Sequence, residues 1–287
     1  EETPWYGSVE KADLDRGLTR TPLGNKGTSG KVLVLAGSGA MCGAAVLCAR
    51  AVLASGAGMV KVVTEERNRT PLFCALPEAM ADFWKEDEPL PEEALLQDLA
   101  WADAVVAGPG LSKSRTAKEL LVFTVQHTEV PLVLDADALN IIAEHRELLD
   151  LLHEGCILTP HMKEFERLAG KSVNDFERLN KLSIFANQYR VHIVLKGAHS
   201  VIATPDRRLF FNMSGNPGMA KGGAGDVLTG VLLALAANKL NLLDLLRIGV
   251  FAHGLAGDCV AEKEGRRGCC AGMIAERMGE AWKRLEK

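Results

Sequence analysis

Six short apolar runs recur through the first two thirds of the chain. They are rich in Val, Ile and Leu, and polar residues do not alternate with the apolar ones. Runs of this kind are typical of strands that are covered on both faces of a sheet. We therefore predict buried strands at 31–37, 59–64, 103–108, 131–136, 156–160 and 192–197.

Segments with helical periodicity separate most of these runs. They occupy 43–58, where Gly56 and Gly58 are stop signals, and then 114–127 and 163–190. Strands that alternate with helices need crossover connections. The pattern thus predicts an α/β fold with a mostly parallel central sheet and helices on both faces.

The pattern changes after His199. Residues 200–212 read as two short strands joined by a turn at Pro205 and Asp206, and three helices follow near 226–237, 243–263 and 271–286. Internal repeats and low-complexity linkers are missing from the sequence. We therefore expect a short lead-in at 1–25 and a single domain at 26–287.

Composition narrows the function classes. The 287 residues are 47% hydrophobic, which allows a sizeable core, and the net charge of -4 provides no basic field for nucleic acid. The longest apolar run, 227–237, is far shorter than the roughly 20 residues of a membrane span. Seven cysteines without a CxxC pair indicate reduced thiols. We expect a cytoplasmic protein without nucleic-acid or membrane partners.

Small, charged and turn-forming residues follow five of the predicted strands. In parallel sheets, ligands bind outside the carboxyl ends of the strands. The sequence therefore predicts a ligand site at one edge of the sheet. The segments concerned are Gly37-Ser38-Gly39, Gly108-Pro109-Gly110, Asp135-Ala136-Asp137, Thr159-Pro160-His161 and Lys196-Gly197.

The most specific motif is SGNPGMAKGGAGDVLTG at 214–230, which is glycine-rich and enters an apolar helix. Successive backbone N–H groups in such a loop form an anion nest, and the following helix adds its positive end. Lys221 is a candidate cationic partner for the anion. Asp226 lies at or near the helix N-cap, so it either caps the helix, takes part in chemistry, or does both. A Walker A motif is absent.

Two weaker motifs leave alternatives open. GSGAMCG at 37–43, with Glu65 and Glu66 after the next strand, resembles a dinucleotide fingerprint but equally describes a tight strand-to-helix turn. His161 and Glu164 are three positions apart near a helix start. This pair either caps the helix or presents both side chains to a ligand or a hydrated metal ion.

Together these segments resemble the NAD(P)H-hydrate dehydratase family of the ribokinase-like superfamily, in order and spacing over about 24–284. The GxGD signature of that superfamily corresponds to Gly223–Asp226. The other matching segments are KGTSGKVLVLAGS (26–38), GAAVLCARAVLASGAGMVKVVT (43–64), VVAGPGL (105–111), VLDADALN (133–140), ILTPHMKEFERL (157–168) and VLKGAHSVIATPD (194–206).

The resemblance implies a repair reaction. Reduced nicotinamide cofactors that have added water are phosphorylated on the new hydroxyl, and departure of phosphate restores the double bond. The substrate would be the S epimer of NADH or NADPH hydrate, and the phosphoryl donor would be ADP or ATP, with ADP favoured. Mg²⁺ is implied because the transferred phosphoryl charge must be neutralised. The alternative is a small-molecule kinase of the same superfamily, of the hydroxyethylthiazole or pyridoxal type.

The resemblance also assigns residues. Asp226 would be the general base, and Ala44, Gly110, His161 and Asp226 would contact the hydrate. Mg²⁺ would be held through phosphates, with Glu164 as a candidate contact. The nucleotide would be held by Lys196, Gly197, Ala198, His199, Ser200, Asn216, Pro217, Gly218, Met219, Ala220, Lys221, Gly222, Gly223, Ala224 and Gly225.

Two positions depart from the family pattern. Met162 replaces the proline that usually follows the histidine, and Ala224 replaces a threonine whose hydroxyl could touch phosphate. The resemblance further implies a homotetramer. Members of the family often carry an N-terminal epimerase domain, so the resemblance implies either a stand-alone dehydratase, which an epimerase could accompany as a separate partner, or the C-terminal part of a bifunctional protein.

Overall fold

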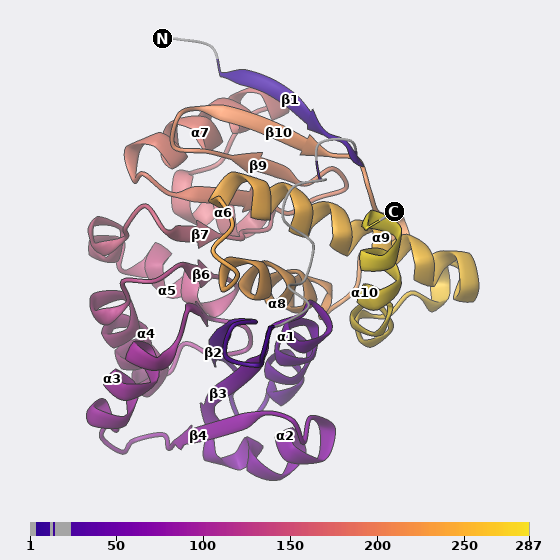
Figure 1. Cartoon of the computed structure of the whole chain (residues 1–287). Coiled ribbons are helices and arrows are strands. Elements are labelled where there is room, and N and C mark those ends of the chain that lie inside the picture. Colours follow the sequence, from indigo (N-terminus) through magenta and orange to yellow (C-terminus); the bar gives the residue numbers. More distant parts are fainter. Residues whose placement is uncertain (1–3, 12–13, 15–23, 287) are drawn as a thin grey trace.

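The computed structural model describes residues 4–11, 14 and 24–286 (Figure 1). Its centre is one ten-stranded sheet with the order β1-β10-β9-β8-β7-β6-β5-β2-β3-β4. The strands are β1 Trp5–Val9, β2 Lys31–Leu35, β3 Met59–Glu65, β4 Met80–Trp84, β5 Ala104–Ala107, β6 Leu132–Leu134, β7 Cys156–Leu158, β8 His192–Leu195, β9 Val201–Ala203 and β10 Arg208–Asn212.

The sheet is mostly parallel, as predicted. Among the described strands only β9 runs against its neighbours, because it pairs antiparallel with both β8 and β10. The six predicted core strands and the hairpin at 200–212 are confirmed. The sequence analysis missed β4, and it missed β1, which pairs in parallel with β10 inside the segment interpreted as a lead-in.

Helices cover both faces of the sheet, which confirms the predicted α/β architecture. The helices are α1 Cys42–Ala54, α2 Arg69–Ala75, α3 Glu92–Trp101, α4 Arg115–His127, α5 Asp137–Glu144, α6 Met162–Ala169, α7 Asp175–Gln188, α8 Ala224–Ala236, α9 Leu242–Gly268 and α10 Ala271–Leu285. Short 3-10 turns lie at η2 Glu66–Asn68, η3 Arg146–Leu151 and η4 Pro217–Met219.

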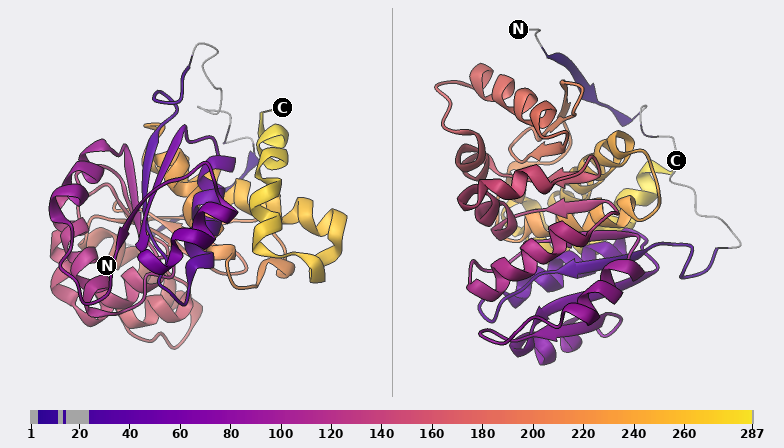
Figure 2. Two further views of the ribbon diagram at one scale, coloured as in Figure 1. Left: turned by 90° about the horizontal axis from the view of Figure 1, so that it is seen from below. Right: turned by 90° about the vertical axis from the view of Figure 1, so that its left-hand side faces the viewer.

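The two faces of the sheet have separate cores. Along β2, Val32 and Val34 pack with α1, α2, α8, α9 and α10, whereas Leu33 and Leu35 pack with α3 to α7. Figure 2 (left) shows these helix layers on opposite sides of the strands. Because every side chain of such a strand is buried, the strand sequence is continuously apolar, and this is the pattern that the sequence displayed.

Helix α8 is the apolar helix that follows the glycine-rich motif, and it lies against α1. A Cβ at Gly230 would stand 2.2 Å from the carbonyl oxygen of Cys48 and 2.9 Å from the Cβ of Ala51. Glycine at this position therefore allows the two helix backbones to approach closely. The contact fixes where the first turn of α8 lies relative to the strand ends.

Candidate active site

The strand order reverses at the boundary between β5 and β2, with seven strands on one side and three on the other. In open α/β sheets, such a switch point opens a crevice at the carboxyl ends of the strands. Two loops meet there through backbone hydrogen bonds. Gly37 N–H donates to Pro109 O at 2.9 Å, and Ser38 N–H donates to Gly110 O at 2.6 Å.

Ala44 and Gly110, two predicted contacts to the hydrate, lie side by side in this crevice. Gly110 has a φ of +59°, and a Cβ added there would stand 2.8 Å from the Cβ of Ala44. The same Cβ would meet Met41 at 2.8 Å. Only glycine therefore fits the turn without displacing the start of α1.

Glu65 closes the turn after β2. Its carboxylate accepts from Gly39 N–H at 2.5 Å and pairs with Arg67 at 3.0 Å. These contacts favour the tight-turn interpretation of residues 37–43, because the carboxylate is already engaged by protein groups. Glu66 pairs with Arg69 at 2.8 Å.

Residues 214–223, here called the glycine loop, lead directly into α8. Gly223 is the N-cap of α8 with a φ of +92°, and a Cβ there would stand 2.6 Å from Leu47 and 2.8 Å from Ala271. The loop is thus pressed against α1 and α10. The first turn of α8 leaves backbone N–H groups without helical partners, which is the arrangement that holds anions.

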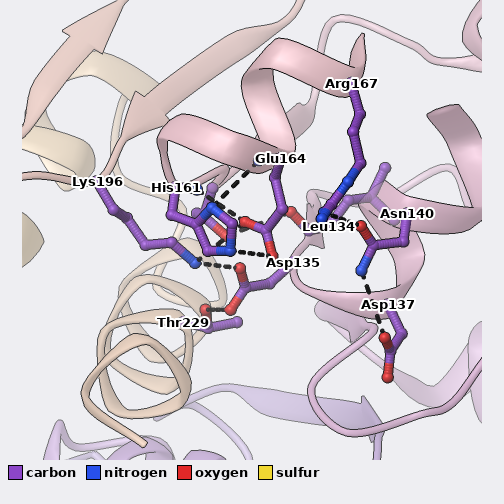
Figure 3. Close-up of polar contacts among 10 residues, drawn as sticks. Leu134, Asp135, Asp137, Asn140, His161, Glu164, Arg167, Lys196 and Thr229 are labelled. Carbon is purple, nitrogen blue, oxygen red and sulfur yellow. Dashed lines mark hydrogen bonds and ion pairs between the residues drawn. The ribbon is translucent and has the colours of Figure 1, made fainter. Parts of the chain in front are cut away.

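Lys196, at the end of β8, brings its ammonium to the start of α8. A Cβ at Gly225 would lie 3.3 Å from Lys196 Nζ. The ammonium donates to Asp135 Oδ1 at 2.5 Å and lies 4.0 Å from Glu164 (Figure 3). These carboxylates raise the pKa of Lys196 although burial opposes its charge. A charged lysine is therefore held where the nest would place an anion.

Asp135 is the buried anchor of this arrangement. Its side chain is 1% exposed, and its second oxygen accepts from Thr229 Oγ1 on α8 at 2.7 Å. Lys196 and the hydroxyl outweigh burial and lower the pKa of the Asp135 carboxyl. The neighbouring Ala136 has an unusual backbone conformation, with φ 48° and ψ -113°. Strain of this kind persists where the surroundings fix the chain, often at functional sites.

His161 and Glu164 form a capping box at the start of α6. Glu164 N–H donates to His161 Nδ1 at 3.1 Å, and His161 N–H donates to Glu164 Oε2 at 2.7 Å. The capping alternative is confirmed, and the box forms with Met162 in the place of the usual proline. The imidazole remains about half exposed although its Nε2 lies 3.3 Å from Glu164 Oε1, and Figure 3 shows it above the Lys196–Asp135 pair.

Asp226 lies in the first turn of α8 but does not cap it. The N-cap is Gly223, and no side chain caps this helix end, so the capping interpretation of Asp226 was wrong. Burial, followed by the charge of Asp135, raises the Asp226 pKa to about 7, although Lys196 opposes this shift. A carboxyl that titrates near neutral pH can accept a proton during catalysis.

The predicted nucleotide contacts form two groups. Lys196 to Ser200 follow β8, and residues 197–199 are exposed. Asn216 to Gly225 lie in the glycine loop and at the start of α8. Lys221, the expected cationic partner, instead donates to Arg267 O at 2.5 Å. The ammonium of Lys196 therefore lies at the first turn of α8, whereas the ammonium of Lys221 contacts the end of α9.

The sequence analysis missed three residues that shape this site. Asp135 was noted only as a strand-end residue, and Thr229 was hidden inside an apolar helix pattern. Asp258, on α9, accepts from Gly215 N–H at 2.9 Å and so holds the glycine loop. None of the three belongs to a motif whose spacing would have revealed its partner, since each contact joins distant parts of the chain.

No helix in the described part of the chain has the length and apolarity to cross a membrane. Within the same residues, no three ligating side chains converge into a metal cage.

The glycine loop and the first turn of α8 together form an anion site, here called the cradle. The fold and the cradle are those of the ribokinase-like class of proteins. A family model for NAD(P)H-hydrate dehydratase matches residues 32–279. The chain belongs to the NAD(P)H-hydrate dehydratase family. It is 36% identical to the ADP-dependent (S)-NAD(P)H-hydrate dehydratase of Neisseria meningitidis, with 88% of this chain and 84% of that protein covered.

A second relative is longer. The bifunctional NAD(P)H-hydrate repair enzyme Nnr of Thermofilum pendens is 36% identical over 93% of this chain. The chain spans 52% of that protein, about half its length.

Solved structures agree with this family. The ADP/ATP-dependent NAD(P)H-hydrate dehydratase of Bacillus subtilis, co-crystallised with ATP/Mg²⁺, has a TM-score of 0.81 and 29% identity, with 98% of this chain and 99% of that chain covered. Ribokinase of Thermotoga maritima, with 13% identity, a TM-score of 0.55 and coverage of 87% and 98%, shares the fold. The ribokinase-like fold predicted from the sequence is confirmed.

Proposed function

We propose that this chain dehydrates the S epimer of NADH or NADPH hydrate with a nucleoside phosphate as phosphoryl donor, ADP in preference to ATP. The observation that carries the proposal is the position of Asp226. Its carboxylate has a pKa of about 7 and lies in the first turn of α8, beside the glycine loop and close enough to Lys196 and Asp135 to interact electrostatically with both. Family membership supports the choice of substrate.

Asp226 would act as general base. As the hydrate hydroxyl attacks the terminal phosphorus, the carboxylate takes the hydroxyl proton, and the bond from phosphorus to the donor breaks. The nucleotide leaves one phosphoryl group shorter. The new phosphate ester then loses phosphate and a proton from the adjacent carbon, which restores the ring double bond. Phosphate departs far more readily than hydroxide, so phosphorylation makes the dehydration possible.

The cradle would hold the donor. The N–H groups of the glycine loop and the first turn of α8 would bind phosphate oxygens, and Lys196 would balance their charge. Ala44, Gly110 and His161 would contact the hydrate, and Asp226 would then lie between the two ligands.

Mg²⁺ fits this site as an ion carried by phosphates and waters. Both oxygens of the buried Glu164 carboxylate already contact His161. Glu164 would therefore meet the ion through a bound water and not as a direct ligand. When bound, the ion would neutralise charge on the transferred phosphoryl group.

Three finer expectations stay predictions of the sequence: a cytoplasmic location, a homotetramer, and an epimerase partner. The Thermofilum relative supports the epimerase partner, because that protein is named a bifunctional repair enzyme and this chain spans only 52% of it.

The test is a nucleotide-dependence assay. Purified chain is mixed with NADH hydrate, Mg²⁺ and either ADP or ATP, and the absorbance of reduced nicotinamide is followed together with free phosphate. We expect NADH and free phosphate to form in equal amounts, and both to form faster with ADP than with ATP. A stable phosphoester without recovered NADH would instead establish the small-molecule kinase, and recovery without any nucleotide would exclude the proposed mechanism.

A further inference from the structure

The glycine loop is laid along one face of α9, a helix that contributes none of the predicted ligand contacts. The contact begins at the start of the loop, where Ser214 Oγ donates to Phe251 O at 2.9 Å. Figure 1 shows α9 running beside α8 and α10 across the same face of the sheet. Helix α9 is therefore positioned to hold the loop in one conformation.

Two glycines on α9 let the loop approach the helix closely. A Cβ at Gly254 would stand 2.1 Å from Ser214 Oγ, and a Cβ at Gly257 would stand 2.2 Å from Met219 Sδ. The Cβ at Gly254 would also stand 2.7 Å from the backbone carbonyl carbon of Ser214, so a side chain there requires the loop itself to move, whereas at Gly257 only the side chain of Met219 has to move. Since the two positions are three residues apart, they lie on one face of the helix.

Asp258 completes that face with a fork of hydrogen bonds. Its Oδ2 accepts from Gly215 N–H at 2.9 Å, and its Oδ1 accepts from the Asn216 side-chain amide at 2.9 Å. Asn216 in turn accepts from Gly218 N–H at 3.0 Å through its Oδ1. One carboxylate thereby fixes the orientation of three successive parts of the loop.

The end of α9 supports the second half of the loop. Lys221 Nζ donates to Arg267 O at 2.5 Å, and a Cβ at Gly218 would lie 2.3 Å from Arg266 O. Lys221 thus acts on the loop through the backbone of α9. Both ends of the loop are therefore bonded to α9, a helix that contains none of the motifs found in the sequence.

We infer that Asp258 is a positioning residue for the nucleotide: it holds the glycine loop in the shape that binds phosphate before the nucleotide arrives. This inference rests on the proposed nucleotide site. A glycine-rich chain has many conformations in the unbound state, and ordering it on binding would weaken affinity. The Asp258 fork removes that cost without any contact to the ligand, so its loss is expected to weaken nucleotide binding specifically.

The experiment compares Asp258→Asn with Asp244→Asn, the same exchange near the start of α9 at a carboxylate for which no hydrogen bond to the glycine loop is found. Binding of ADP and ATP is measured by calorimetry, and KM and kcat are measured with NADH hydrate. We expect Asp258→Asn to weaken ADP binding and raise the nucleotide KM on the order of tenfold, with the hydrate KM unchanged. The Asp244→Asn variant is expected to match the wild type.

A second pair of variants covers the case in which Asp258→Asn fails to fold. Gly254→Ala forces the backbone of Ser214 to move, whereas Gly272→Ala adds the same methyl group in α10, where nothing lies within 4 Å. We expect only Gly254→Ala to weaken ADP binding.

The outcomes separate the two proposals. Wild-type affinity for ADP in both Asp258→Asn and Gly254→Ala would overturn the positioning role and leave the proposed function intact. A wild type that bound neither nucleotide would overturn both. An equal fall in affinity for hydrate and nucleotide would show general damage to the fold and would also contradict the inference.

Discussion

Lys196 Nζ lies 2.5 Å from Oδ1 of Asp135, and this carboxylate is almost completely buried. The pair joins the end of β8 to the end of β6 at the point where α8 begins. Because Asp135 also accepts from Thr229, one carboxylate fixes both the cation and the helix.

Asp135→Asn is expected to destabilise the protein by about 3–5 kcal/mol, because it leaves a buried lysine without its counter-charge. The double variant Asp135→Asn/Lys196→Met is expected to regain much of that loss while binding ADP as weakly as Lys196→Met alone. Urea unfolding gives the free energy of unfolding, and calorimetry gives the affinity. Equal stability of wild type and Asp135→Asn would contradict a structural role for the ion pair.

Asp226→Asn is expected to lower turnover by roughly 10²–10⁴-fold, the usual contribution of a general base. ADP binding is expected to stay near the wild-type value, because the phosphate contacts come from backbone N–H groups and Lys196. The measurement is kcat on NADH hydrate beside the calorimetric affinity for ADP. A variant with full activity would remove Asp226 from the mechanism.

The raised pKa of Asp226 also predicts a pH profile. The base must be ionised to accept a proton, so kcat/KM is expected to rise with pH and to level off above about 7. The profile is measured with saturating nucleotide and limiting hydrate, and with Asp226→Asn as the control that lacks the transition. A profile that falls through neutral pH would assign the controlling group to an acid instead.

The same pKa affects stability with a defined sign. A carboxyl whose folded pKa of about 7 exceeds its unfolded value near 3.9 favours folding only while it is protonated. Its contribution is present below the unfolded pKa and is lost as pH rises toward 7. Asp226→Asn is therefore expected to raise Tm relative to wild type at pH 8, with a difference that vanishes near pH 4. A constant difference across that range would show that Asp226 does not titrate as described.

The sequence predicted the sheet well because burial on both faces leaves a simple signal. Each of the six runs became a parallel strand, and the glycine loop was located from its composition. The two missed strands, β1 and β4, lie at the edges of the sheet, where fewer neighbours demand apolar residues. Trp5 and Met80, for instance, are exposed, so their strands carry no continuous apolar run.

The site was predicted less completely, for a different physical reason. Local motifs report local contacts, such as the capping box of His161 and Glu164. The groups that organise the cradle act over long sequence distances, as Thr229 does on Asp135 and Asp258 does on Gly215. The pKa of Asp226 has the same origin, since it depends on burial and on charges contributed by other segments. A single sequence contains no pattern that links such positions.

Gly110 offers a test of the hydrate side of the crevice. Alanine at this position must adopt a φ of +59°, and its Cβ would stand 2.8 Å from Ala44 and Met41. We expect Gly110→Ala to raise the hydrate KM more than tenfold and the ADP KM far less, because the added methyl group intrudes where the hydrate would bind. Steady-state kinetics with each substrate varied in turn separates the two constants.

The matched control for this variant is Gly170→Ala. Gly170 also has a positive φ, of +82°, but nothing lies within 4 Å of an added Cβ. Both variants place an L side chain at a positive φ, and Gly170, with a ψ of 160°, lies in a region that essentially only glycine adopts, so the control reports the effect of backbone strain alone. Only Gly110→Ala adds the clash, so a loss of hydrate affinity confined to it must come from the crowded turn. Equal kinetics in the two variants would remove Gly110 from the hydrate site, whereas a comparable loss of ADP affinity in Gly110→Ala would show that the turn serves both ligands.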